Sequence, residues 1–131
     1  MTEYHRTSIR VLYGDVDSMK QAYYGNYLRW FETGRAEYLR AHGVPYNEVE
    51  RRGFFLPVSE VFCKYLKPIH YDDLIFIEAK PDQVKRASAR FLYRLLNEEG
   101  GDLAFGYTLH PCLDAEGRIV RIPRFLLNIL D

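Results

Sequence analysis

The sequence predicts an α+β fold in which one long helix packs against an antiparallel sheet. Residues 25–42 carry apolar side chains at helical spacing, and residues 54–113 form a succession of strand-like segments separated by turn residues. A further alternating segment, residues 5–13, precedes the helix. The apolar face of the helix needs a cover, and a curved antiparallel sheet wrapped around it is the simplest one.

Length and composition exclude several classes of protein. The 131 residues predict a single domain over 1–131, and 18 Lys and Arg against 18 Asp and Glu give no sign of a nucleic-acid binder. Two cysteines, Cys63 and Cys112, are too few for a disulfide framework, so we expect buried free thiols and a cytoplasmic location. The first ten residues do not resemble a signal peptide, and no apolar run reaches the ~20 residues of a transmembrane segment.

The helix has a clear apolar face and a clear end. Gly34 lies on this face, where the missing side chain would let the covering layer approach closely. Gly43 and Pro45 predict the end of the helix, and a short second helix follows over 46–52. The residues predicted to share the apolar face are Tyr27, Phe31, Gly34, Tyr38 and Ala41.

The strand-like segments differ in character. Residues 74–79 are apolar on both faces, which predicts a central strand covered on both sides. In the segment 103–113, the small residues Ala104, Gly106 and Thr108 alternate with large ones, and such a face invites close packing by a helix or a neighbouring chain. The other predicted strands are 54–65, where Pro57 indicates an edge strand or an irregular start, 87–96 and 118–123, and a last helical turn is predicted over 125–130.

The polar turn before the long helix carries two carboxylates, Asp15 and Asp17. The first turn of a helix has free backbone N–H groups and a partial positive charge, which can hold a developing oxyanion. A carboxylate beside such donors can act as a base or nucleophile on the same carbonyl. On spacing alone, the alternative stays open that both aspartates simply cap the turn or the helix.

The sequence gives little support for a triad hydrolase, a phosphate-binding loop or a metal site. The chain has no G-x-S-x-G sequence and no glycine-rich phosphate loop, so a triad hydrolase and a nucleotide-binding loop are not expected. The histidines have no metal-ligand spacing, so no metal site is expected; they are His5, His42, His70 and His110.

Six segments in order resemble the hot-dog fold acyl-CoA thioesterases, above all the 4-hydroxybenzoyl-CoA thioesterase and YbgC-like family. The most specific are YGDVD at 13–17, YGNYLRWFETGR at 24–35 and YLKPIHYDD at 65–73. The others are 104–108, 114–118 and 122–123. The resemblance therefore covers nearly the whole chain.

The resemblance implies a long central helix wrapped by a curved five-stranded antiparallel sheet. It also implies a homo-oligomer, a dimer or tetramer, whose sheets pair edge to edge with active sites at the subunit interface. The expected substrate is an acyl-CoA with a short-chain or aromatic acyl group, which is hydrolysed to free acid and CoA. No cofactor is expected, since CoA is part of the substrate, and an acyl carrier protein is a further possible partner.

Within this family the second aspartate of the D-x-D pair is the catalytic carboxylate, here Asp17. The family's oxyanion donors are backbone N–H groups at the start of the long helix, here at Tyr24 and Gly25. Both roles agree with the reasoning from the residues alone, and Asp15 is assigned a structural role in the turn. One departure is Lys20, where the family usually has glycine; it could pair with Asp17, meet an anionic acyl chain or a CoA phosphate, or face solvent.

Each of the other predicted substrate-binding residues also has a purely structural interpretation. Tyr27 could line an acyl pocket or belong to the core, and Glu32 could approach the site or pair with Arg35. Surface cations hold the CoA phosphates in this family, so Lys85, Arg86 and Arg118, with the neighbouring Ser88, are candidates, although most surface cations are merely solvated. The alternative function is a non-catalytic hot-dog module that binds CoA or acyl carrier protein thioesters.

Overall fold

The computed structural model describes residues 3–131, which form one antiparallel sheet and three helices. The strands are β1 (His5–Arg10), β2 (Glu60–Tyr65), β3 (Leu74–Asp82), β4 (Ser88–Leu96) and β5 (Asp102–Pro111). The helices are α1 (Gly25–Ala41), α2 (Tyr46–Arg51) and α3 (Arg124–Leu130), with a 3₁₀ turn at Tyr13–Asp15. The expected α+β fold with five antiparallel strands is confirmed.

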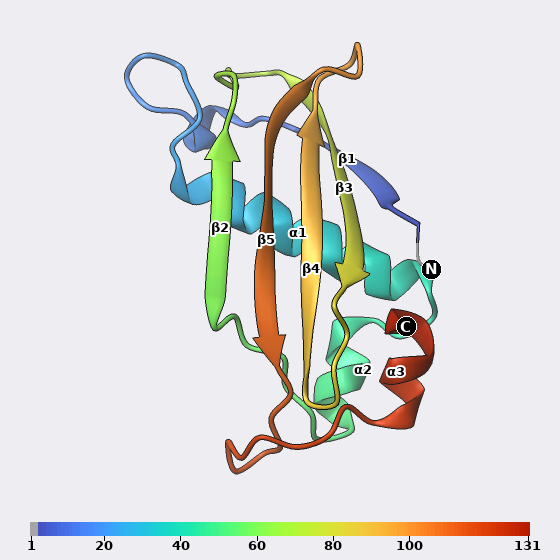
Figure 1. Cartoon of the computed structure of the whole chain (residues 1–131). Coiled ribbons are helices and arrows are strands. Elements are labelled where there is room, and N and C mark those ends of the chain that lie inside the picture. The colour runs from blue at the N-terminus through green and yellow to red at the C-terminus, as the bar shows by residue number, and fades with distance from the viewer. Residues whose placement is uncertain (1–2) are drawn as a thin grey trace.

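The strand order in the sheet is β1-β3-β4-β5-β2. Strand β2 precedes β3 in the chain but lies at the far edge, where its one partner among the described strands is β5. Helix α1 crosses one face of the sheet, and α2 and α3 lie near its C-terminal end (Figure 1). The turn before α1 and the connection between β3 and β4 lie at opposite ends of the sheet (Figure 1).

Several predicted strand boundaries were wrong. The predicted strand 54–65 is regular only from Glu60, because Pro57 has no N–H to give a sheet and the preceding residues make just one isolated bridge, from Phe55 to Leu113. Residues 118–123 contribute another isolated bridge and no strand. The first strand ends at Arg10, where the chain turns toward the 3₁₀ segment.

Strand β3 lies inside the sheet between β1 and β4, second from the edge rather than at the centre, and it is not covered on both faces. Ile75, Ile77 and Ala79 are fully buried under α1, whereas the alternate residues, such as Phe76 and Glu78, are half-buried on the outer face. Among residues 3–131 no helix packs on this outer face (Figure 1). The prediction that both faces are covered was based on the apolar Leu74 and Phe76. In the structure these two residues lie on the half-buried outer face, which they share with charged neighbours.

The close approach of α1 to the sheet depends on two glycines, as the sequence predicted. A Cβ at Gly34 would lie 2.7 Å from Ile77 Cγ2, and one at Gly106 would lie 2.9 Å from Phe31 Cε2. Phe31 stacks on Tyr93 of β4 with ring centroids 4.3 Å apart. Each such fully buried aromatic ring stabilises the fold by roughly 1.5–3 kcal/mol. Of the predicted helix face, only Ala41 is exposed.

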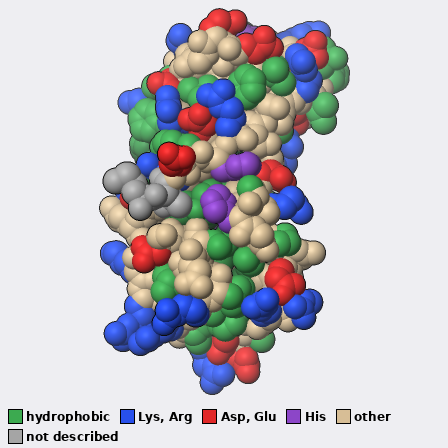
Figure 2. All heavy atoms as spheres, turned by 90° about the vertical axis from the view of Figure 1, so that its right-hand side faces the viewer, with side chains coloured by type: hydrophobic (Ala, Val, Ile, Leu, Met, Phe, Trp, Pro, Cys, Tyr) green, Lys and Arg blue, Asp and Glu red, His purple; other side chains and the backbone are tan. Residues whose placement is uncertain are grey.

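The remaining compositional expectations have mixed outcomes. Cys112 is buried and Cys63 is only half-buried, and both are free thiols. No helix in the described part of the chain is long and apolar enough to cross a membrane. Basic and acidic side chains are interspersed over the face shown in Figure 2, which fits the zero net charge.

Candidate active site

Residues 15–17 and 21–23 form a short antiparallel hairpin just before α1. Asp17 lies at its tip, where its N–H donates to the carbonyl across the hairpin at 2.9 Å. The second arm also pairs with the loop before β3, since the N–H of Ala22 donates to the carbonyl of Ile69 at 2.7 Å. Backbone contacts from two other segments therefore fix the position of Asp17.

The side chain of Asp17 is exposed, and one of its two carboxylate oxygens accepts hydrogen bonds from the described residues. Its Oδ1 accepts from the N–H groups of Met19 (2.9 Å) and Gln21 (3.3 Å). Its Oδ2 accepts no hydrogen bond from any residue between 3 and 131. One oxygen thus orients the carboxylate, and the other is available to a substrate or to water.

Asp15, two residues earlier, is in the opposite situation. Its side chain is buried, its Oδ2 accepts from the N–H of Leu12 at 2.8 Å, and its Oδ1 forms an ion pair with Arg29 of α1 at 2.5 Å. Its carbonyl accepts from Asn26 Nδ2 at 2.6 Å. Asp15 therefore joins the hairpin to the first turns of α1.

The start of α1 presents two backbone donors. The N–H groups of Tyr23 and Asn26 donate within the turn, but those of Tyr24 and Gly25 have no acceptor in the described residues. Both lie where the helix dipole concentrates positive charge. Tyr24, whose backbone is already helical, lies three residues after Gln21, whose carbonyl accepts from the N–H of Asp17.

A cavity of about 260 Å³ opens beside these donors. The ring of Tyr65, at the end of β2, lies 4.7 Å from the rings of both Tyr24 and Tyr27. Burial raises the pKa of Tyr27 to about 12, so its hydroxyl stays protonated and can donate. The residues lining the cavity are Gln21, Ala22, Tyr24, Tyr27 and residues 65–69. Tyr65 was missed as a site residue, although it opens the YLKPIHYDD segment.

Lys20 occupies a backbone conformation that favours glycine, with φ at 64°. Its ammonium group lies over the ring of Tyr13, with Nζ 5.5 Å from the ring centroid. It forms no ion pair with Asp17 within residues 3–131. The positive φ agrees with the usual glycine of this turn, and the cation is directed to a neighbouring ring rather than to the carboxylate.

The other predicted substrate-binding residues lie far from Asp17 in the same chain. Lys85 and Arg86 are exposed in the connection between β3 and β4, and Ser88 begins β4, at the opposite end of the sheet (Figure 1). Arg118 is already engaged by Asp114, at 3.0 Å. A single chain therefore does not bring these residues to the carboxylate.

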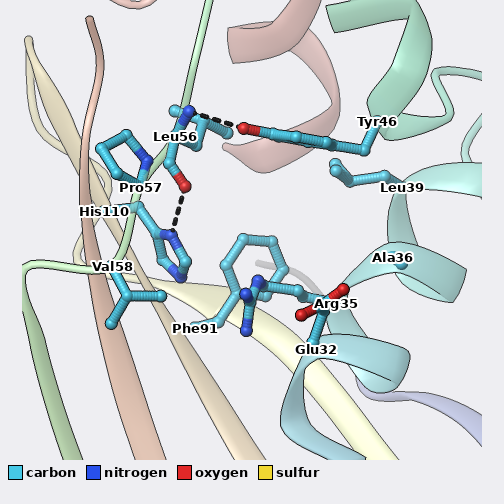
Figure 3. A pocket seen from close by; sticks show the side chains of 10 residues that line it. All are labelled: Glu32, Arg35, Ala36, Leu39, Tyr46, Leu56, Pro57, Val58, Phe91 and His110. Carbon is cyan, nitrogen blue, oxygen red and sulfur yellow. Dashed lines mark hydrogen bonds between the residues drawn. The ribbon is translucent and has the colours of Figure 1, made fainter. Parts of the chain in front are cut away.

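A second cavity of about 260 Å³ lies farther along α1, between α1, α2, the segment before β2 and the sheet (Figure 3). Its wall is mainly apolar. Glu32 and Arg35 provide its charged groups, and neither forms an ion pair in the described residues. Its lining consists of Glu32, Arg35, Ala36, Leu39, Tyr46, Leu56, Pro57, Val58, Phe91 and His110.

His110 of β5 is the buried polar group of this second cavity. It is 1% exposed, its Nδ1 lies 2.9 Å from the carbonyl of Leu56, and its Nε2 lies 2.7 Å from Thr108 Oγ1 (Figure 3). Burial lowers the pKa of His110 to about 4, so the ring is neutral near pH 7. Its inward position continues the alternation in β5 that places Gly106 and Thr108 on the helix-facing side.

The family model of the thioesterase-like superfamily matches residues 11–130. In sequence, the acyl-CoA thioester hydrolase YbgC of Escherichia coli O6:H1 is 26% identical over 113 residues, which cover 86% of this chain and 84% of the relative.

Two solved structures are similar over nearly the whole chain. A hypothetical protein of Aquifex aeolicus has a TM-score of 0.93 at 29% identity, covering 97% of this chain and 99% of that one. The DHNA-CoA thioesterase of Staphylococcus aureus has a TM-score of 0.89 at 28% identity, covering 95% and 85%. The curved sheet and its helix thus have the hot-dog architecture that the sequence predicted.

Proposed function

Because the chain belongs to the thioesterase-like superfamily, we propose that it hydrolyses acyl-CoA thioesters with Asp17 as the catalytic carboxylate. The observation that carries this proposal is the free Oδ2 of Asp17 in a fixed hairpin that leads directly into the two free N–H groups of α1. Family membership also favours an enzyme over the non-catalytic binding module.

In this mechanism the thioester carbonyl oxygen accepts from the N–H groups of Tyr24 and Gly25, which stabilise the negative charge that develops on it. Asp17 either removes a proton from an attacking water or attacks the carbonyl carbon itself. In the first route the C–S bond breaks, the CoA thiolate leaves and takes up a proton, and the acyl group is released as the free acid. In the second route loss of the thiolate leaves the acyl group bonded to Asp17 as an anhydride, and water then cleaves this bond, which releases the acid and restores the carboxylate. CoA enters as part of the substrate, so this chemistry needs no additional cofactor. The free cysteines fit the proposed cytoplasmic location.

The proposed enzyme is a homo-oligomer built through the free edge of β2. Within residues 3–131 this strand pairs on one side only, and it exposes Val61 (42%), Phe62 (43%) and Tyr65 (42%). An unpaired edge of this kind is a template for a second strand, and a two-fold axis would align β2 antiparallel with its copy. The start of one β2 would then lie opposite the end of the other.

Such pairing would complete the site. The second cavity adjoins the start of β2 through Pro57 and Val58, whereas the thioester site adjoins its end through Tyr65. The second cavity of one copy would therefore face the hairpin of the other and receive the acyl group. The same pairing would bring the far end of the sheet, with Lys85 and Arg86, toward the other copy's CoA phosphates.

The proposed acyl group is short or aromatic. A cavity of about 260 Å³ with a mostly apolar wall has room for a ring or a short branched chain. The structural neighbour from Staphylococcus aureus, at 28% identity, is a DHNA-CoA thioesterase, which supports an aromatic acyl group.

The test is thiol release from a panel of short, long and aromatic acyl-CoAs by the wild type and Asp17→Asn. We expect turnover of short or aromatic thioesters and a loss on the order of a thousandfold in Asp17→Asn, because asparagine keeps the hairpin but is neither base nor nucleophile. Asp102→Asn, an exposed carboxylate at the start of β5, is the matched control and should retain full activity. Equal rates for wild type and Asp17→Asn would rule out the assigned role.

A further inference from the structure

A buried chain of hydrogen bonds connects Arg35 of α1 with the segment before β2. Arg35 Nη1 lies 3.5 Å from the hydroxyl oxygen of Tyr93, which lies 2.5 Å from Thr108 Oγ1. Thr108 Oγ1 lies 2.7 Å from His110 Nε2, and His110 Nδ1 lies 2.9 Å from the carbonyl of Leu56. Tyr93, Thr108 and His110 are all at most 2% exposed.

Chemistry allows only one direction for the hydrogens in this chain. The carbonyl of Leu56 can only accept, so His110 carries its proton on Nδ1 and, as a neutral ring, accepts on Nε2 from Thr108. Thr108 then accepts from the hydroxyl of Tyr93. The oxygen of Tyr93 accepts from the guanidinium of Arg35, which can only donate. Both ends of this series of hydrogen bonds are fixed, so no donor and acceptor within it can exchange roles.

The segment before β2 is held from two sides. The carbonyl of Leu56 accepts from His110, and its N–H donates to the hydroxyl of Tyr46 at 2.9 Å (Figure 3). Both backbone polar groups of Leu56 are thus engaged by side chains from β5 and α2. The apolar wall that follows, Pro57 and Val58, therefore has a fixed position relative to Arg35.

Arg35 uses little of its donor capacity in this chain. A guanidinium has five N–H donors, and only the contact with Tyr93 engages them in the described residues. Figure 3 shows the guanidinium of Arg35 and the carboxylate of Glu32 among the side chains that line the second cavity. The cavity therefore combines a mostly apolar wall with donors from a half-buried cation and an acceptor from one anion.

We propose that Arg35 is a specificity-determining residue of the acyl cavity, where it donates to an uncharged oxygen at the far end of the acyl group. Acyl groups that end in a hydroxyl or keto oxygen then bind more tightly than unsubstituted ones. Glu32 favours an uncharged oxygen over a carboxylate, because a second anion beside it would be repelled. This inference rests on the proposed function, in which the cavity receives the acyl group.

Binding of thioether analogues tests this without any need for hydrolysis. Isothermal titration calorimetry would give the Kd of hydroxyphenacyl-CoA, phenacyl-CoA and carboxyphenacyl-CoA for the wild type and for Arg35→Met. We expect the wild type to prefer the hydroxylated over the plain analogue by roughly tenfold, the size of one charge-assisted hydrogen bond. Arg35→Met should abolish this preference while the Kd of the plain analogue changes by less than about twofold.

The matched control is Arg40→Met on the same helix, where the exposed arginine pairs with Glu37 at 3.3 Å, outside the cavity. It should keep the wild-type preference. Equal binding of the hydroxylated and plain analogues by the wild type, or the same loss for both in Arg35→Met, would overturn the proposal. Tightest binding of the carboxylated analogue would overturn the choice of an uncharged oxygen. Failed hydrolysis with an intact preference would count against the proposed function alone.

The positioning role of the chain has its own test. Thr108→Val removes the central hydroxyl without changing a residue that lines the cavity, and we expect it to weaken the preference of Arg35 for the hydroxylated analogue. Thr108→Ser keeps the hydroxyl and should restore both the preference and the nitrogen NMR shifts of an Nδ1-protonated His110. A folded Thr108→Val protein with an unchanged preference would show that the chain does not position Arg35.

Discussion

The hairpin that carries Asp17 and the buried series of hydrogen bonds that includes His110 use polar groups in opposite ways. Asp17 is exposed and leaves one carboxylate oxygen without a protein donor. His110 is buried with both ring nitrogens bonded, and its neighbour Thr108 is bonded on both sides. In the described residues, no buried side-chain nitrogen or oxygen lacks a partner.

The difference separates two tasks that a site requires. A group that reacts with substrate must keep free lone pairs at an accessible place, and water can satisfy them until the substrate arrives. A group that holds other groups in position must be fully bonded, because an unpaired polar atom in the interior costs about 1–3 kcal/mol. Substitution of Asp17 should therefore affect activity, and substitutions of buried, fully bonded groups should affect the free energy of unfolding.

Gly106→Ala should give the largest effect on stability. Its Cβ would meet the carbonyl oxygen of Phe62 at 2.0 Å and the ring of Phe31 at 2.9 Å, so β2 or α1 must move. We expect a loss of about 3 kcal/mol in the free energy of unfolding, measured with urea. Gly14→Ala in the exposed turn has no atom within 4 Å of its Cβ and is the control, with a change below about 0.5 kcal/mol. Similar losses would contradict the contrast between a packed interior and an open turn.

Asp15→Asn should destabilise the protein by about 2 kcal/mol, because it removes a buried carboxylate that pairs with Arg29 and accepts from the N–H of Leu12. Asp17→Asn should change stability by less than about 0.5 kcal/mol. Urea unfolding of the two variants would compare the same substitution two residues apart. If both lost the same stability, the structural and reactive roles of the two aspartates would not be separate.

The pKa of His110 near 4 predicts a pH-dependent stability. Between about pH 4 and 6.5 the unfolded chain binds a proton on this residue and the folded chain does not, so stability rises with pH by up to about 1.4 kcal/mol per unit. Above the unfolded pKa this contribution is complete and constant. Urea titrations across this window would measure it, with His70→Gln, an exposed histidine, as the control that keeps the slope. The same slope in His110→Gln would assign the effect to other groups.

Lys20→Gly should have the smallest effect, a stabilisation of about 0.5 kcal/mol. The φ of 64° is unfavourable for lysine and free for glycine, and the greater entropy of glycine in the unfolded chain offsets part of the gain. Thermal unfolding of Lys20→Gly and Met19→Gly would show the difference, since Met19 has no positive φ and should only lose stability. A loss in both variants would mean that the turn prefers the lysine.

Local features of the sequence predicted the helix and the turn well. The helical repeat located α1 and the role of Gly34, and the strand predicted over 87–96 forms as β4, with Phe91, Tyr93 and Leu95 buried. The D-x-D turn and the helix start lie within about ten residues of one another, so their proximity could be predicted from sequence. Their catalytic roles stay predictions until activity is measured.

Features that depend on distant contacts could not be predicted. The hydrogen bonds that connect Arg35 with Leu56 join residues from α1, β4, β5 and the segment before β2, and no local sequence pattern shows that these elements meet. The register between β2 and β5 is equally non-local, and it is needed to place the second cavity near the free edge. The half-covered outer face of β3 was also missed, because apolar residues at its start obscured the alternation.

The position of β2 has a consequence for the order in which the molecule is made. Phe62 pairs with Tyr107, which is synthesised 45 residues later, so β2 has no partner in its own sheet until β5 has left the ribosome. Contacts of such long range form slowly, and the strand that waits for them is open to foreign strands in the meantime. A chain truncated before β5 would leave both edges of β2 unpaired. Two copies can therefore pair through a β2 that is held in its own sheet only after each chain has completed its last strand.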